Sequence, residues 1–148
     1  MSLTLEIEDG RWRRTRSLSA RLKKAVRAAL AEAGADEAAD LTVLLTTDKR
    51  VQALNRDFRS KDKPTNVLSF PSGGNDYLGD IAMAYGVTAK EAKAEGKTLL
   101  DHATHLAVHG VLHLVGYDHV TARQAKVMEP METRILATLG IADPYETR

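Results

Sequence analysis

Residues 109–119 have the sequence HGVLHLVGYDH, and this segment decides the expected architecture. All five histidines of the chain lie between His102 and His119, the last residue of the segment. His109 and His113 are four residues apart, so on a helix both side chains leave the same face, about 6 Å apart along the axis. Gly116 allows the chain to leave the helix and turn back. His119 can then approach the same point as the first two histidines.

Three neutral imidazoles with an open fourth position are typical of a catalytic zinc site, since structural zinc is usually closed by four protein ligands. A single histidine on an amphipathic helix is usually a hydrogen-bonded packing residue, but three at ligand spacing around a glycine turn favour metal binding. The spacing does not distinguish zinc from nickel, cobalt or iron, and zinc is the default for imidazole ligands. We expect one Zn²⁺ ion, bound by His109, His113 and His119, that activates a water molecule.

The composition fits one small enzyme domain. The chain has 148 residues, 43% of them hydrophobic, and no break in composition marks a second unit, so we expect a single domain over residues 1–148. Cysteine is absent, which excludes disulfides and thiolate ligands and leaves histidine and carboxylate for a metal site. No apolar stretch points to export or membrane insertion, and we expect a soluble, cytoplasmic protein.

Hydrophobic periodicity predicts strands and helices that alternate along the chain. The expected strands lie at residues 3–7, 41–47, 66–70 and 79–84. The last two are expected to form a hairpin through the polar turn at 71–76. The expected helices lie at residues 17–33, 48–58, 98–115 and 122–139, with a further helical stretch before Gly96.

Several helix ends carry recognisable signals. Asp48 is the expected N-cap of its helix. Thr88 with Glu91 and Thr121 with Gln124 resemble capping boxes. The tail from residue 141 onward is short, and we expect it to be loosely held.

Basic residues gather in two places, although the formal net charge is only +1. The arginines between residues 11 and 16 fit a solvated face, the ordinary fate of a charge run. The second cluster is interrupted by Asp57 and Asp62 and leads into Pro64 and the strand at 66–70; its members are Arg56, Arg59, Lys61 and Lys63. This cluster is the better candidate for contact with an anionic partner.

The histidine block also matches the spacing of metzincin metalloproteases at positions 109, 113, 116 and 119. In that class a glutamate after the first histidine takes the proton from the zinc-bound water, and here the position is Gly110, which has no side chain. Peptide hydrolysis by that route is therefore disfavoured. Met128 is interpreted as a core methionine and not as the methionine beneath a metzincin site, and His102 and His105 are left without a role.

With glycine at position 110, residues 109–119 resemble the signature of the YbeY family of bacterial endoribonucleases. Two further segments resemble the same family: Leu54 to Pro71, through Asn55, Phe58, Arg59, Lys61 and the run PTNVLSFP, and Leu78 to Ile81. The resemblance covers roughly residues 40 to 140 and is only general over the first 35 residues. Asn66 departs from the pattern, since aspartate is expected there in many members.

The resemblance implies an α+β fold with a small mixed four-stranded sheet, surrounding helices and a zincin-like metal-binding helix. It implies that His109, His113 and His119 bind zinc and that Arg59 works in the cleft. An arginine there fits the chemistry, because guanidinium binds phosphate bidentately and stabilises the charge of phosphodiester cleavage. The general base stays open between Asp80, Asp118, His105 and the 2′-hydroxyl of the RNA, and Asp118 is equally a candidate to orient a ligand histidine.

By the same resemblance, the expected activity is single-strand-specific endoribonuclease cleavage in 16S rRNA maturation, ribosome biogenesis and ribosome quality control. The expected partners are single-stranded RNA, rRNA and ribosomal subunits, with an assembly GTPase and ribosomal proteins as further candidates and no membrane. Because aromatic residues are few, recognition should rest on backbone and shape. Two alternatives stay open: a zinc peptidase or other small-molecule hydrolase, and a ribosome-assembly factor whose metal mainly holds the fold.

Overall fold

A four-stranded mixed sheet forms the centre of the computed structural model, which describes residues 2–36, 38–117 and 121–146. The strand order is β1-β2-β4-β3, with β1 at Ser2–Ile7, β2 at Asp40–Thr46, β3 at Val67–Pro71 and β4 at Tyr77–Ala84. β1, β2 and β4 are parallel, and β3 pairs antiparallel with β4 as the expected hairpin. The predicted α+β class with a small mixed sheet is confirmed.

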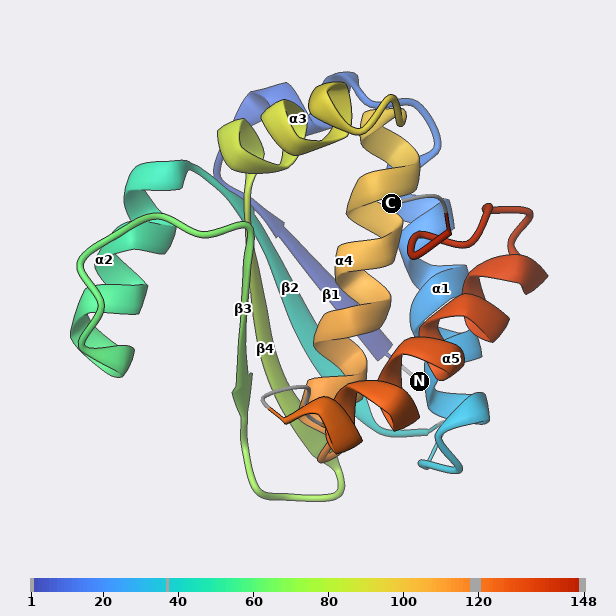
Figure 1. The fold of residues 1–148 in the computed structure, drawn as a ribbon. Helices are drawn as coiled ribbons and strands as arrows, with labels where there is room; N and C mark the ends of the chain where they lie inside the picture. The colour runs from blue at the N-terminus through green and yellow to red at the C-terminus, as the bar shows by residue number, and fades with distance from the viewer. Residues whose placement is uncertain (1, 37, 118–120, 147–148) are drawn as a thin grey trace.

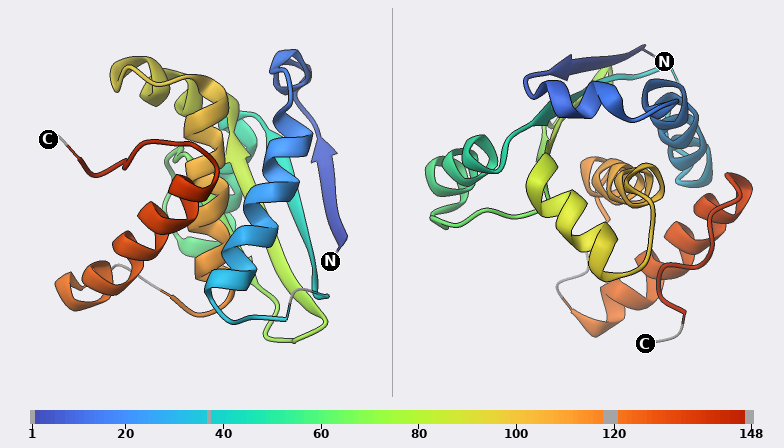
Figure 2. Two further views of the ribbon diagram at one scale, coloured as in Figure 1. Left: turned by 90° about the vertical axis from the view of Figure 1, so that its right-hand side faces the viewer. Right: turned by 90° about the horizontal axis from the view of Figure 1, so that it is seen from above.

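The helices surround this sheet unevenly (Figure 1). Their bounds are Gly10–Arg14 for the 3-10 helix η1, Leu18–Glu32 for α1, Asp48–Arg59 for α2, Tyr85–Ala94 for α3, Leu99–Leu114 for α4 and Ala122–Thr138 for α5. α4 lies against one face of the sheet, with α1 and α5 on its outer side and α3 across one end (Figure 2). The helix that carries the histidines is thus the central helix of the fold.

α4 is buried because apolar residues occupy most of its circumference. Leu106, Val108, Val111 and Leu112 lie in the main hydrophobic core together with residues of α1, β2, β4 and α5. A helix enclosed in this way is held rigidly, so its polar side chains keep fixed directions. Among the residues that the structure describes, no helix has the length and apolar character needed to cross a bilayer.

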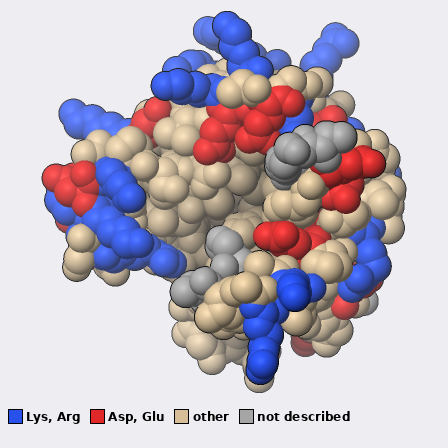
Figure 3. Space-filling model, in the orientation of Figure 1, with Lys and Arg blue, Asp and Glu red and all other residues tan. Residues whose placement is uncertain are grey.

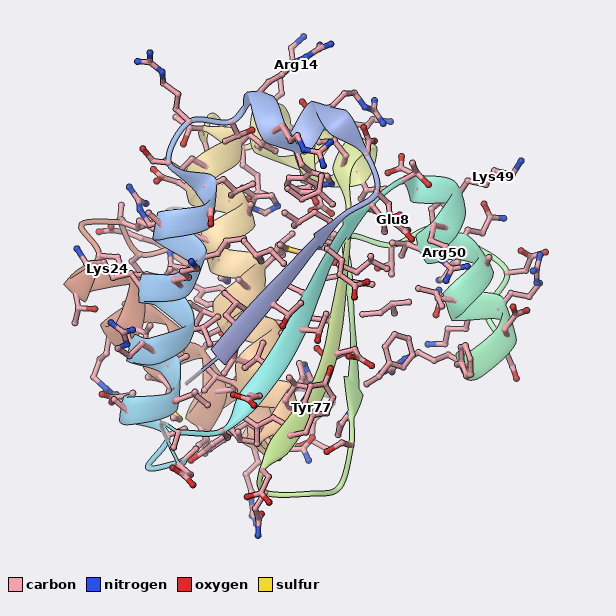
Figure 4. All side chains as sticks on the ribbon, turned by 180° about the vertical axis from the view of Figure 1, so that it is seen from behind. Glu8, Arg14, Lys24, Lys49, Arg50 and Tyr77 are labelled. Carbon is pink, nitrogen blue, oxygen red and sulfur yellow. The ribbon has the colours of Figure 1, made fainter. Side chains whose placement is uncertain are left out.

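The opposite face of the sheet is covered mainly by α2, which packs over β3 and β4 around a second apolar cluster that includes Val51 and Leu68. Beyond α2 this face is open, and Figure 4 shows the Tyr77 side chain lying across the strands there. The Tyr77 hydroxyl hydrogen-bonds the carboxylate of Asp80 and lies 2.7 Å from the Thr42 hydroxyl. Near the other end of the face, Glu8 and Arg50 lie side by side, with Nε of Arg50 3.9 Å from Oε1 of Glu8 (Figure 4).

Two predicted helix caps are wrong, and one contact between helices explains both. Thr47, and not Asp48, caps α2, because the Thr47 hydroxyl accepts from the Arg50 N–H at 3.1 Å. The Asp48 carboxylate instead accepts from the Val87 N–H of α3 at 3.0 Å. α3 therefore begins at Tyr85, capped from outside its own sequence, and the predicted Thr88–Glu91 box does not form.

The remaining terminal signals behave as expected. The Thr121–Gln124 capping box of α5 is present in full.

The arginines between residues 11 and 16 are exposed, while Trp12 among them is buried and donates its indole N–H to the carbonyl of Thr46 at 3.1 Å. This first basic cluster is thus a solvated face anchored by one aromatic ring.

Candidate active site

The two helical histidines of the 109–119 block face each other on α4. Their Nε2 atoms are 3.0 Å apart, and their ring centroids are separated by 4.6 Å. After α4 ends, Gly116 adopts φ 105°, and the Tyr117 N–H returns to the Leu112 carbonyl at 2.9 Å, which is the predicted glycine turn. His119 and Asp118 lie outside the described residues, so the predicted third ligand is not placed.

Gly110 sets how closely α4 approaches the sheet. It is buried against β4, and a Cβ atom there would lie 3.0 to 3.2 Å from the side-chain carbons of Ile81. The Gly110 carbonyl also accepts a hydrogen bond from the Ser69 hydroxyl of β3 at 3.2 Å. The lack of a side chain at this position is therefore a packing requirement as well as the loss of a metzincin-type base.

A buried carboxylate stands behind His109. Glu132 of α5 has no exposed surface, and its Oε2 lies 2.9 Å from Nδ1 of His109 and 3.3 Å from Nε2 of His105. Burial raises the pKa of Glu132, but the hydrogen bonds from His105 and His109 outweigh this and lower it to about 2. Glu132 is therefore ionised at neutral pH.

The carboxyl-terminal tail closes the same cluster. The Tyr145 hydroxyl donates to Oε1 of Glu132 and lies 3.4 Å from Nε2 of His105. The rings of Tyr145 and His105 meet edge to face with centroids 5.7 Å apart. The prediction of a loosely held tail is wrong, because the tail packs on side chains of α4 and α5 that were not expected to meet it.

Arg59 lies at the end of α2, beside the edge strand β3. Its guanidinium donates through Nη2 to the Ser69 carbonyl at 2.5 Å and lies over the Phe70 ring, 5.6 Å from the centroid. Because Ser69 in turn bonds Gly110 on the histidine helix, β3 connects the arginine to α4. The remaining guanidinium N–H groups form no hydrogen bond with the described residues and are available to an anion.

Arg59 and the histidine pair line one cleft of about 890 Å³ between β3, α4 and the loop after α2. Lys61 and Lys63 lie on the same wall as Arg59, and within the described ranges none of these three cations forms an ion pair. The two acids that interrupt this cluster in sequence have other partners, since Asp57 pairs with Arg56 and Asp62 bonds Gln52. In Figure 3, basic side chains gather over α2 beside a hollowed face of the molecule.

The wall toward α3 has a different character. Oε1 of Glu91 accepts from the Asn66 amide at 3.0 Å and lies 2.8 Å from Nε2 of His102, which is 4% exposed. Asn66 is thus held by a carboxylate, and an aspartate in its place would meet that carboxylate directly. Figure 3 shows acidic side chains on the α3 side of the hollowed face.

The described residues supply two of the three ligands predicted for a metal ion, and the predicted third ligand lies outside them. Two imidazole nitrogens converge, and the second ring nitrogen of His109 meets a carboxylate, as is usual for histidine ligands of metals. Within residues 2–36, 38–117 and 121–146, no three histidine or carboxylate side chains are grouped closely enough to hold an ion. A complete metal site therefore needs a further ligand from outside these ranges, and His119 is the residue that the sequence predicts for it.

The open choice of general base becomes narrower. Asp80 bonds Tyr77 on the opposite face of the sheet and does not line the cleft. His105 does line the cleft, although its Nδ1 is buried and has no hydrogen-bond partner among the described residues.

Met128 is fully buried in the hydrophobic core, in agreement with its interpretation as a core residue.

Sequence reasoning missed Glu132, Tyr145 and Glu91. Glu132 had a detectable signal, because it lies within a stripe of α5 whose other members are buried and apolar: Met128, Met131, Ile135 and Leu136. A carboxylate in such a stripe requires buried polar partners. Tyr145 and Glu91 had no comparable signal, because their roles depend on segments that meet only in the folded chain.

Comparison with known proteins found matches along most of the chain. A family model described as Endoribonuclease YbeY matches residues 5–140, including most of the amino-terminal segment for which we expected only a general likeness. The Endoribonuclease YbeY of Rhodopseudomonas palustris (strain HaA2) is 50% identical over 148 residues, covering 90% of this chain and 76% of that protein. The Endoribonuclease YbeY of Erythrobacter litoralis is 46% identical over 164 residues, covering 100% of this chain and 99% of that protein.

A solved structure shares the fold. The solution structure of TM1509 from Thermotoga maritima superposes with a TM-score of 0.58 at 23% sequence identity, covering 98% of this chain and 99% of that one. Because the family model spans nearly the whole length and the relatives match most of the chain, this protein belongs to the Endoribonuclease YbeY family.

Proposed function

We propose that this protein is a metal-dependent endoribonuclease that cleaves single-stranded RNA. The observation that carries the proposal is the meeting of the His109–His113 pair with Arg59 in one cleft. The family to which the chain belongs is named for endoribonuclease activity, which supports the same conclusion.

The basic wall is suited to the RNA backbone. Arg59 keeps guanidinium N–H groups for a phosphate after donating to Ser69, and it can neutralise charge that develops on the scissile phosphate. Lys61 and Lys63, which form no ion pair with the described residues, contact the neighbouring phosphates. Contacts of this kind fix the position of the strand without selecting a base sequence.

We propose that His109, His113 and His119 hold one Zn²⁺ ion. Bound zinc would supply a Lewis acid at the scissile phosphate, together with a means of generating the nucleophile at neutral pH. Glu132 accepts from Nδ1 of His109, which leaves the Nε2 lone pair of that ring for the metal. The carboxylate thereby keeps the ligand in its binding form.

The biological setting is proposed on the same basis. We infer that the substrate is rRNA, with 16S rRNA maturation, ribosome biogenesis and ribosome quality control as the processes served. The proposed partners are ribosomal subunits, with an assembly GTPase and ribosomal proteins as further candidates. We place the protein in the cytoplasm and treat residues 1–148 as a single hydrolase domain.

The test compares four protein samples on three substrates. Wild type loaded with zinc, wild type after chelation, Arg59→Ala and His113→Ala are each incubated with a single-stranded RNA, its duplex and a peptide pool. We expect cleavage of single-stranded RNA by the loaded wild type alone. Peptide cleavage would indicate a zinc peptidase, and absence of all cleavage with a large fall in melting temperature on chelation would indicate a structural metal in an assembly factor.

A further inference from the structure

After α5 ends at Thr138, the segment up to residue 146 returns to the cleft, which Pro144 and Tyr145 line. Asp143 anchors this return, because its Oδ1 accepts from the Thr133 hydroxyl at 3.1 Å and from the Tyr145 N–H at 2.8 Å. Pro144 is buried and lines the cleft. These contacts hold Tyr145 against the cluster formed by Glu132, His105 and His109.

The hydrogen atoms in this cluster can be assigned from the acceptor at its centre. Three groups that can donate surround the two oxygens of Glu132 at hydrogen-bonding distance, which is the environment of a carboxylate that accepts from each of them. Oε2 receives the two imidazole nitrogens of His105 and His109, and Oε1 receives the Tyr145 hydroxyl. Both oxygens of a fully buried anion are therefore occupied by donors.

This assignment fixes the tautomer of His109. Its Nδ1 must carry the hydrogen that Glu132 accepts, so in the neutral ring the lone pair lies on Nε2. The Nε2 atom is the one that faces His113 across 3.0 Å. The alternative tautomer would direct a lone pair at the carboxylate and would put a hydrogen where the lone pair is needed.

We propose that Tyr145 is a positioning residue of this site, which holds Glu132 in the orientation that keeps His109 protonated at Nδ1. Without the phenol hydrogen, Oε1 of Glu132 loses the donor that the tail supplies, and the carboxylate can turn away from His109. The tail is then part of the metal-binding apparatus, although it lies beyond the end of α5 at Thr138. The expected effect on zinc affinity rests on the proposed function, whereas the expected effect on the His109 tautomer does not.

The experiment measures the tautomer of His109 and the affinity for zinc in Tyr145→Phe. The ring nitrogen shifts of His109 in the metal-free protein report the tautomer by NMR, and competition with a chromophoric chelator reports the zinc dissociation constant. We expect His109 to lose its pure Nδ1–H form and the affinity for zinc to fall about 10-fold, within the range seen for partners behind metal ligands. A folded Tyr145→Phe protein with an unchanged tautomer and unchanged affinity would overturn the proposal.

Two further variants make the result decisive. Glu132→Leu removes both carboxylate oxygens, so His109 loses the acceptor at its Nδ1 and we expect it to shift toward the Nε2–H form; an unchanged tautomer in this variant also overturns the proposal. Tyr77→Phe is the matched control, because it removes a hydroxyl that likewise bonds a carboxylate, Asp80, on the far face of the sheet. We expect Tyr77→Phe to behave as wild type in both measurements, and an equal loss of zinc affinity there would refute a specific role for Tyr145.

The outcome is separable from that of the proposed function. If the wild type bound zinc but did not cleave RNA, the proposed activity would fail while the His109 tautomer and the zinc affinities still decided the role of Tyr145. If the wild type bound no zinc, the tautomer measurement alone would decide it.

Discussion

Gly110 and Ile81 are packed so closely that a methyl group at position 110 would lie 3.0 Å from Cδ1 of Ile81. This contact brings the histidine helix against β4 and excludes any side chain at the position where metzincin proteases carry their general base. Core packing at position 110 therefore excludes the glutamate that a metzincin-type protease needs, although the histidine spacing is the same.

Gly110→Ala should destabilise the protein despite the higher helix propensity of alanine. Overpacking against Ile81 costs about 1–3 kcal/mol, and the gain in propensity returns about 1 kcal/mol, so we expect a net loss of about 1 kcal/mol. Urea unfolding measures this free energy. In an Ile81→Val background, which removes the atom at 3.0 Å, the cost should shrink or reverse; an equal cost in both backgrounds would refute the contact.

Arg59→Ala should abolish most RNA cleavage with little effect on the fold. Loss of a donor that stabilises developing charge lowers kcat by about 10²- to 10³-fold. Stability should fall by about 1 kcal/mol or less, since Arg59 is exposed and contributes one hydrogen bond and one ring contact. Arg56→Ala is the control, because Arg56 pairs with Asp57 and does not line the cleft. Equal losses of kcat in the two variants would show that only net charge matters.

Glu132 should make stability fall in acid. Its pKa is about 2 in the folded chain and 4.5 as an ordinary glutamate, so its contribution is present above pH 4.5 and is lost as the pH falls toward 2. The gap corresponds to about 3 kcal/mol. Urea unfolding of the metal-free protein at pH 7, 4.5 and 3 should show a weaker pH dependence in Glu132→Gln, and parallel curves for the two proteins would contradict the assignment.

Asn66→Asp should be destabilising at neutral pH and less so in mild acid. The new carboxylate would lie where the Asn66 amide now donates to Glu91 at 3.0 Å, and two adjacent carboxylates raise the pKa of one of them. A raised folded pKa gives stability at low pH that is lost as the pH rises. We expect a deficit of about 1–2 kcal/mol at pH 8 that narrows by pH 5. Asn75→Asp in the exposed β3–β4 turn should show no such trend.

The sequence predicted the parts of the site that depend on local pattern. The spacing of His109 and His113, the glycine turn at Gly116 and the β3–β4 hairpin all follow from interactions within a few residues of each other. Alternation indicated the strands, whereas the mixed four-stranded sheet was implied by the resemblance of three motifs, because its parallel pairs join strands that are distant in sequence.

The remaining parts depend on contacts between distant segments. Asp48 caps α3 and not α2 because the start of α3 folds against it, and no local rule includes that approach. Glu132 and Tyr145 reach His109 only after α5 and the tail have packed on α4. Such contacts are set by tertiary packing, so the periodicity of one segment cannot reveal them.

The measurement that tests the central claim most directly is the rate of single-stranded RNA cleavage as zinc is added back to chelated protein. We expect no cleavage without metal and a rate that rises to a plateau at about one zinc ion per chain, as one catalytic site requires. A rate that is the same before and after addition of zinc would contradict it.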